Sequence, residues 1–256
     1  MKTLSKPLFG AEHLNNCLEN IAEARLIFIG GRPGSMKLNF LHNLLQRHIE
    51  HVRNVPVFLT GTSKDYLIKK WEALGMEMDQ NAVYFKNNKA PVFFLDEING
   101  WDLEKVCNQT RNLHHLFKFP FVIIDNFENI RNDDCFILHD KKEDTLERLR
   151  CLSQELQIPI LILSELKPSI EKRKGHKKRP RLIDIYTDRF ICMLDYIVLF
   201  YRPEYFQIEK WEDGTSTANQ LELNFAKTPT GISFRKVLQF HFNERKSLVF
   251  SEIHSE

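Results

Sequence analysis

The sequence lacks the features that mark a secreted or membrane protein. Its five cysteines, at positions 17, 107, 135, 151 and 192, include no Cys-x-x-Cys pair, so neither a disulfide framework nor a zinc site is expected. The first residues, MKTLSKPLFGAEHL, contain no apolar signal-peptide core, and apolar runs such as IPILIL and YIVLFY are too short to span a membrane. We therefore expect a cytoplasmic protein with reduced thiols and no membrane contact.

Charge of either sign is not in large excess. A net charge of +2 gives no global field that attracts nucleic acid, so any such contact has to come from local clusters. The 256 residues, 43% of them hydrophobic, are enough to bury a substantial core, and no repeat, low-complexity linker or clear domain boundary is visible. We expect one domain over residues 1–256, in which residues 1–24 form an N-terminal lead-in segment.

Short apolar runs alternate with segments of helical spacing. The runs are nearly continuous in apolar residues, as in strands that are buried on both faces of a parallel sheet. They occupy residues 26–29, 55–59, 92–95, 119–124, 158–163 and 196–201. Apolar residues repeat at helical spacing within residues 40–49, and again at Leu146, Leu149, Leu152 and Leu156. The alternation predicts an α/β fold with a mostly parallel central sheet flanked by helices.

The pattern changes from residue 221 onward. LELNFAK, GISFRKVLQFHF and LVF are short and alternate apolar with polar residues, and Pro229, Gly231 and Asn243 interrupt them. This arrangement is typical of antiparallel strands joined by turns. We therefore expect a C-terminal antiparallel hairpin that extends the sheet.

The stretch GGRPGSMKLNF, residues 30–40, nearly matches a phosphate-binding loop, which follows a strand, opens a helix and reads G-x-x-x-x-G-K-[ST]. Gly31 and Lys37 occupy the first glycine and the lysine positions, and the helix is expected from Asn39. Met36 replaces the glycine that lets the backbone approach phosphates, and Leu38 replaces the hydroxyl that ligates Mg²⁺. The loop alone is equally compatible with phosphate binding through Lys37 and with a tight structural turn.

A carboxylate follows a later apolar strand. FVIIDN places Asp125 at the C-terminal end of that strand, where α/β sheets hold a Mg²⁺-associated carboxylate. The alternative is ordinary turn chemistry, because strands often end in Asp. Its distance downstream of the loop favours Asp125 as a candidate metal ligand.

Five segments, in order, resemble the DnaB-type replicative helicases, in the C-terminal RecA-like ATPase domain of that family. The loop is similar to the family pattern G-R-P-x-M-G-K-T-x-F at Gly31, Arg32, Pro33, Lys37 and Phe40. IPILILSELK resembles the family's strand-and-sensor segment, EKRKGHKKRPRLID its basic loop, DYIVLFYRPEYF a later strand, and LNFAKTPTG its AK-x-R element. The resemblance spans residues 20–250 and implies a RecA-like P-loop NTPase fold. The family's separate N-terminal primase-interacting domain has no counterpart in the match.

The resemblance implies a nucleotide site for ATP and Mg²⁺ whose catalytic positions are changed. The positions that it assigns to nucleotide binding are Gly31, Arg32, Pro33, Gly34, Ser35, Met36, Lys37, Leu38, Asp125 and Lys227, with Asp125 also as metal ligand. Gly61 stands where the family has its water-activating glutamate, and Pro229 occupies the arginine-finger position. No catalytic residue is assigned. Glu165 replaces a family glutamine and is one candidate; Glu128 is the other, as a substitute base or as a surface carboxylate.

One segment carries a strong positive cluster. Residues 172–181, KRKGHKKRPR, hold seven Lys and Arg residues, which favour phosphate contacts without sequence preference. The candidates for DNA contact are Lys172, Arg173, Lys174, Lys177, Lys178, Arg179 and Arg181. In the resembled family this segment belongs to loops that face a central channel, whereas the alternative is a disordered, solvated loop. We predict contact with single-stranded DNA.

Three functions are compatible with these observations. The favoured one is a degenerate, non-catalytic or weakly active relative that binds DNA or nucleotide in DNA replication or mobile-element maintenance. The second is an active ATP-dependent DNA helicase with unusual catalytic residues, and the third is a scaffold for assembly only. For the favoured function, a helicase-type or primase-type protein is a candidate partner. We predict a monomer or loose oligomer in place of the family's hexamer.

Overall fold

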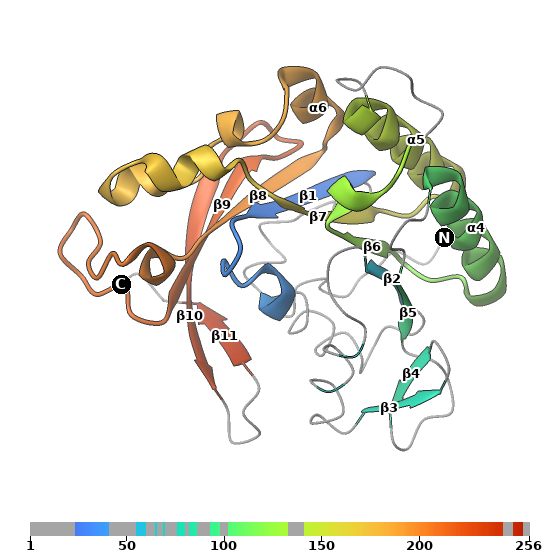
Figure 1. Cartoon of the computed structure of the whole chain (residues 1–256), viewed down its shortest axis with the longest axis horizontal. Helices are drawn as coiled ribbons and strands as arrows, with labels where there is room; N and C mark the ends of the chain where they lie inside the picture. Colours follow the sequence, from blue (N-terminus) through green and yellow to red (C-terminus); the bar gives the residue numbers. More distant parts are fainter. Residues whose placement is uncertain are drawn as a thin grey trace.

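The computed structural model describes residues 24–40, 55–59, 65, 69, 76–79, 82–85, 93–97, 102–132, 141–242 and 248–252. Within these residues one sheet holds eleven strands in the order β11-β10-β9-β8-β1-β7-β6-β2-β5-β4-β3 (Figure 1). β1 (Leu26–Gly31) lies between β7 (Ile160–Glu165) and β8 (Tyr196–Tyr201) and is parallel to both. The strand that precedes the glycine-containing loop is therefore central in the sheet.

The parallel part continues through β6 (Val122–Asp125), β2 (Val55–Leu59) and β5 (Phe93–Glu97). Each of these strands falls on a predicted apolar run. β6 and β7 begin later than their runs, directly or shortly after Pro120 and Pro159, because proline cannot donate to a strand ladder. The mostly parallel sheet predicted from the sequence is confirmed.

Antiparallel strands extend the sheet at both edges. On one side β9 (Gln220–Lys227), β10 (Phe234–Phe242) and β11 (Leu248–Glu252) run antiparallel to their neighbours, which confirms the predicted C-terminal extension. On the other side β3 (Met76–Asp79) and β4 (Ala82–Phe85) form a hairpin that the sequence reading missed. Its first strand, MEMD, has only two apolar residues, and such a strand carries little periodic signal.

Helices α4 (Leu103–Phe117) and α5 (Lys141–Leu156) pack together, and α5 also contacts β1 and β7 (Figure 1). Leu146, Leu149 and Leu152 of α5 are almost completely buried, as their helical spacing predicts. On the short helix α6 (Asp188–Met193), Phe190 meets Phe28 of β1 edge to face, with ring centroids 5.8 Å apart. The core therefore joins the central strand to helices far along the chain. No helix within the described residues has the length and apolar content needed to cross a bilayer.

Candidate functional site

The loop over residues 31–38 contains two residues with left-handed backbone, a conformation that occurs in anion-binding turns. Gly34 and Met36 both adopt the left-handed conformation, with φ of 75° and 69°. The Met36 carbonyl accepts from the Phe40 amide at 2.9 Å, and residues 37–40 are helical. The helix thus begins at Lys37, two residues before Asn39, where the sequence predicted its start. The first amides of a helix have no acceptor within the helix and can bind an anion.

Close packing inside the loop fixes its shape. A Cβ atom added to Gly31 would lie 2.3 Å from Ser35 Oγ, so only glycine fits there. The Ser35 amide donates to the Arg32 carbonyl at 3.0 Å, while Ser35 Oγ is buried with no hydrogen-bond partner within the described residues. Two features favour glycine at position 34. Its φ is positive, and an added Cβ atom would lie 2.8 Å from the Tyr205 ring.

Lys37 is buried and bound to its own loop. Its Nζ donates to the Gly31 carbonyl at 2.6 Å, and the residue is only 9% exposed. Burial lowers the pKa of the Lys37 ammonium from 10.5 to about 8, although the negative charges of Glu165, Asp125 and Glu128 oppose this shift. These three carboxylates therefore lie within electrostatic reach of the ammonium, at the carboxyl ends of β6 and β7.

The fold brings the predicted acidic candidates to one end of the sheet. Asp125 ends β6 and is buried, and its register partner on β7 is Leu163. Glu128 lies in the short 3-10 turn η1 (Phe127–Asn129), where its Oε1 accepts from Ser164 Oγ, from the Glu165 amide at 2.8 Å and from Tyr186 Oη at 2.7 Å. Glu128 is therefore held by the end of β7, and is not a freely solvated surface carboxylate.

Arg32 ties the loop to the segment that follows β7. Its guanidinium donates to the Leu166 carbonyl at 2.7 Å and to Glu171 Oε1 at 2.8 Å. Glu165 Oε2 lies 3.9 Å from the same guanidinium. The arginine that the family pattern places in the loop is thus a structural tether here. Pro33 beside it is exposed at the tip.

Lys227 lies at the other end of the sheet from the loop. It pairs in register with Ile197 near the start of β8, whereas Gly31 pairs with Phe200 near the end of that strand. Its Nζ donates to the Ile191 and Cys192 carbonyls at 2.9 and 3.1 Å, at the last turn of α6. Within one chain the fold separates Lys227 from the other residues assigned to nucleotide binding. Its nucleotide contact stays a prediction that requires a second copy.

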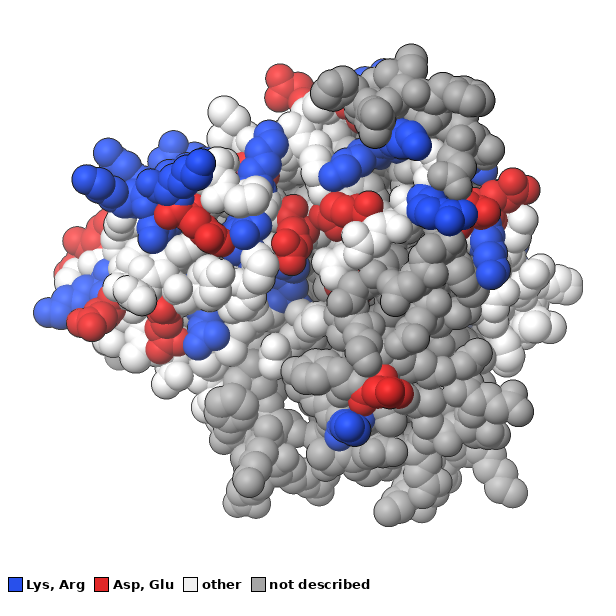
Figure 2. Space-filling view, viewed as in Figure 1, with Lys and Arg blue, Asp and Glu red and all other residues white. Residues whose placement is uncertain are grey.

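The basic segment, residues 172–181, folds into 3-10 turns. It runs from the end of η2 (Pro168–Lys172) through η3 (Gly175–Lys178) toward η4 (Leu182–Asp184). The alternative of a disordered loop is therefore wrong. The segment exposes Lys172, Lys174, Lys177 and Arg181, and Figure 2 shows Lys and Arg gathered over it at the upper left. Arg173 instead forms a paired contact with the buried carboxylate of Asp184.

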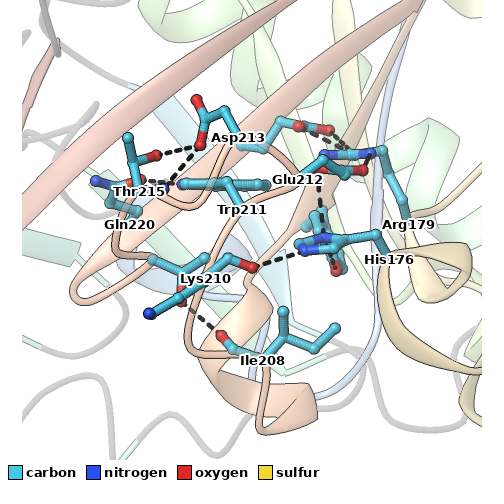
Figure 3. A network of polar contacts seen from close by, with 12 residues as sticks. His176, Arg179, Ile208, Lys210, Trp211, Glu212, Asp213, Thr215 and Gln220 are labelled. Carbon is cyan, nitrogen blue, oxygen red and sulfur yellow. Dashed lines mark hydrogen bonds and ion pairs between the residues drawn. The ribbon is translucent and has the colours of Figure 1, made fainter.

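Arg179 fastens the basic segment to the sheet. It is bound to Glu222 on β9 through Nε, at 2.9 Å, and to Glu212 through Nη1, at 2.7 Å. Its guanidinium also lies 5.6 Å from the centroid of the Trp211 ring, on which the His176 ring stacks (Figure 3). Together the ion pairs and ring contacts hold the segment in place. Arg179 and Arg173 are therefore structural, and four of the seven DNA-contact candidates are exposed.

The sequence reading missed several residues of this network, among them Glu222, Glu212 and Trp211. The alternation in LELNFAK placed Glu222 on the polar face of β9, but nothing in the sequence paired that face with Arg179. Tyr186, which binds Glu128, was also missed, because the two residues lie far apart in the sequence. Pairings of this range depend on the fold and leave no local pattern.

Comparison with known proteins places these features in a family. The family model described as "DnaB-like helicase C terminal domain" matches residues 73–247. The chain is 23% identical over 229 residues to the replicative DNA helicase DnaB of Rickettsia prowazekii, covering 78% of this chain and 47% of that protein. It is 24% identical over 230 residues to a probable plasmid replicative DNA helicase of Chlamydia psittaci, covering 89% and 45%.

The fold also matches solved structures. A DnaB-like replicative helicase, whose structure was described with its interactions with primase, superposes with a TM-score of 0.70 at 18% identity. That match covers 88% of this chain and 57% of the other. The likeness shows a RecA-like fold with a parallel core. The chain spans about half the length of the curated relatives it matches.

Proposed function

The chain belongs to the DnaB-like helicase C-terminal domain family, and we propose that it binds single-stranded nucleic acid without rapid ATP hydrolysis. The observation that argues against rapid hydrolysis is the state of the 31–38 loop. Its lysine is buried and bound to the loop's own carbonyl. Met36 has a left-handed backbone conformation, and the side chain of Leu38 has no oxygen to ligate Mg²⁺.

The residues fit a phosphate group better than they fit a Mg²⁺–ATP complex. Loop amides, the start of the helix and the Lys37 ammonium supply donors for an anion. Asp125 supplies one carboxylate for a metal, but Leu38 lacks the hydroxyl that P-loop proteins direct at Mg²⁺. When bound, Mg²⁺ would neutralise charge that develops on the phosphates. We therefore propose weak nucleotide binding that depends little on Mg²⁺.

The positions of the acidic residues also argue against efficient hydrolysis. A general base has to reach the attacking water and accept its proton. Glu128 already accepts three hydrogen bonds through one oxygen, from Ser164, the Glu165 amide and Tyr186. These contacts hold its carboxylate against the end of β7. The Gly61 position lies outside the described residues.

A second candidate function, a slow ATPase, is favoured by one observation. The loop keeps the left-handed backbone at residue 36 although the side chain is Met, and three carboxylates remain within electrostatic reach of Lys37. A site with this arrangement needs few changes to accept Mg²⁺–ATP. We propose that the double variant Met36→Gly, Leu38→Thr binds ATP at least tenfold more tightly in Mg²⁺ than wild type does.

Calorimetric titration with ATP, with and without Mg²⁺, tests the nucleotide part of the proposal. We expect wild-type binding to be weak, to change little with Mg²⁺ and to be lost in Lys37→Ala. The Lys118→Ala variant is the matched control, because Lys118 is an exposed lysine at the C-terminal end of α4 and is not among the residues assigned to nucleotide binding. Tight, Mg²⁺-dependent binding by wild type would favour the active-helicase alternative.

The exposed lysines of the basic segment carry the nucleic-acid part of the proposal. We expect a labelled single-stranded oligonucleotide to bind with an affinity that falls steeply with salt, because each phosphate contact releases counterions. Lys172→Gln combined with Lys177→Gln should lower the affinity and the salt slope. Lys105→Gln combined with Lys118→Gln removes two exposed lysines from α4 and its C-terminal end, and should change neither. Equal effects of the two pairs would contradict the proposal.

Binding partners and assembly belong to the same proposal. A solved relative is described with primase, and we propose that this chain also docks a helicase-type or primase-type protein. If neither nucleotide nor nucleic acid binds, only a scaffolding role remains. The basic segment, the 31–38 loop and the C-terminal strands lie in one sheet framework, which supports a single functional domain.

A further inference from the structure

The basic segment covers the polar face of β9 and leaves a pocket there. On β9 the side chains of Leu221, Leu223 and Phe225 are buried on one face, while Glu222, Asn224 and Ala226 alternate onto the other. The segment from His176 to Leu182 lies over this second face, and Arg235 of β10 pairs in register with Asn224. The basic segment, β9 and β10 line an open pocket of about 280 Å³, which we call the arginine pocket. Ser233 also lines it.

Part of the arginine pocket is already neutralised. The Glu222 carboxylate beside it is bound to Arg179 at 2.9 Å. Both ring nitrogens of His176 are engaged, by the Lys210 carbonyl at 2.7 Å and by Tyr201 Oη at 3.3 Å. These contacts, which Figure 3 shows in part, build the wall of the pocket and leave little capacity to bind a ligand.

The remaining groups are donors with spare capacity. Arg235 is 56% exposed at its side chain, and among the described residues its one ion pair is a long contact of 3.8 Å from Nε to Glu222 Oε1. The Arg181 side chain is exposed, and within the described residues it has no ion pair or hydrogen bond. The side chains of Asn224 and Ser233 likewise make no hydrogen bond to any described residue. Two guanidinium groups, an amide and a hydroxyl therefore line one open pocket.

We propose that the arginine pocket binds a phosphate group of single-stranded nucleic acid. Guanidinium groups bind phosphate oxygens with paired hydrogen bonds. Arg179 is shared between Glu222 and Glu212, so one carboxylate charge stays uncompensated, and the two positive charges of Arg181 and Arg235 exceed it. The exposed Lys177 lies on the same segment, one residue after His176 and four before Arg181, both of which line the pocket. The inference rests on the proposed nucleic-acid contact and assigns it a specific anchor.

Arg235 provides the sharpest test because it lies outside the basic segment. In fluorescence anisotropy with a labelled oligothymidine, Arg235→Gln should lower the affinity by about tenfold at low salt. The salt slope should fall by about 0.7, the value for one lost phosphate contact on a single strand. Arg235→Lys should keep the slope but not the full affinity, because lysine keeps the charge and loses the paired geometry.

The neighbouring residue is a matched control. Lys236 is next to Arg235 on β10, but it pairs with Leu223 and therefore points to the opposite face of the sheet. Lys236→Gln should leave affinity and slope unchanged. Arg181→Gln is a second variant, and we expect it to behave like Arg235→Gln. Urea unfolding of each variant checks that the fold is intact.

Other outcomes separate the possible failures. If Arg235→Gln and Arg181→Gln bind like wild type while Lys172→Gln with Lys177→Gln weakens binding, the pocket assignment is wrong and the proposed function stands. If wild type binds no oligothymidine, both fail. If polyglutamate of matched charge binds as tightly as the oligothymidine, and Arg235→Gln abolishes this, the pocket is a site for acidic protein segments and the nucleic-acid assignment is overturned.

Discussion

At the residue scale, Met36 and Lys37 set the properties of the loop. A phosphate-binding backbone needs a left-handed residue at position 36, and Met36 adopts it at φ 69° despite its Cβ. Such a conformation costs an L-residue about 1–2 kcal/mol. The backbone at Met36 is therefore strained. Packing of Gly31 against Ser35 and the hydrogen bond from Arg32 to the Leu166 carbonyl keep the loop in this conformation.

Relief of this strain is measurable. Met36→Gly should raise the free energy of unfolding by about 0.5–1 kcal/mol, since the gain at positive φ exceeds the extra entropy of glycine in the unfolded chain. Leu38→Gly is the control, because residue 38 is helical and glycine there should destabilise by about 1 kcal/mol. Urea unfolding of both variants gives the two values. Destabilisation by Met36→Gly would show that residue 36 is not strained.

The buried ammonium of Lys37 predicts a pH dependence of stability. The unfolded chain holds this proton up to about pH 10.5, whereas burial lowers the pKa in the folded chain to about 8. Between these values the unfolded state binds more protons, so the contribution of Lys37 to the free energy of unfolding rises with pH. From pH 7 to pH 9 wild type should gain about 1 kcal/mol relative to Lys37→Met in urea unfolding. Parallel pH profiles of the two proteins would contradict a buried, depressed lysine.

At the element scale, the basic segment is bound to the sheet through Arg179 and Glu222 of β9. Arg179 is 16% exposed at its side chain and its partner Glu222 only 4%, so their ion pair is largely shielded from water. Arg173 makes a similar contact with Asp184 in the following turn. The ion pairs of Arg173 and Arg179 fix the backbone that carries the exposed Lys172, Lys174 and Lys177. Fixed cations lose less conformational freedom on binding than a disordered loop would.

The anchoring pair can be tested by a double-mutant cycle. Arg179→Gln leaves Glu222 buried without its main partner and should lower the free energy of unfolding by about 3 kcal/mol. Glu222→Gln in the same background should recover part of this loss, because a neutral amide replaces the unpaired charge. Urea unfolding of the two single variants and the double variant measures the coupling. Strictly additive losses would mean that the two side chains do not interact.

The elements differ in how well the sequence predicted them. β2 and β8 match their predicted bounds, and the leucine stripe of α5 is buried, because continuous apolar runs and helical spacing are local signals. The sequence placed Lys37 after one apolar run and Asp125 at the end of another, but not the strand order that brings them to one end of the sheet. The fold of the basic segment could not be predicted, because Arg179 is held by Glu222, 43 residues away. The same holds for Glu128 and its partner Tyr186.

At the scale of the whole molecule, the two ends of the parallel strands carry different functional groups. The 31–38 loop and the acidic residues lie at the carboxyl ends of the parallel strands, whereas Lys227 binds α6 near the start of β8. The AK-x-R element of the resembled family pattern ends in an arginine. Here Pro229 occupies the arginine position of that element, and a proline supplies no cation.

This difference is the basis of our prediction of the assembly state. We expect a monomer or loose oligomer, because a neighbour gains no charged contact to the nucleotide through residue 229. Light scattering coupled to gel filtration, with and without ATP, measures the mass. The Pro229→Arg variant is an informative comparison, and it should associate more strongly when ATP is present. A stable hexamer of the wild-type chain would contradict the expectation.

The central proposal is that this family member does not turn over ATP efficiently. The direct measurement is release of inorganic phosphate by the pure protein in Mg²⁺–ATP, with and without single-stranded DNA, alongside Lys37→Ala and the Met36→Gly, Leu38→Thr double variant. We predict that wild type and Lys37→Ala release phosphate at the same background rate, with or without DNA. DNA-stimulated release by wild type that Lys37→Ala abolishes would contradict the account.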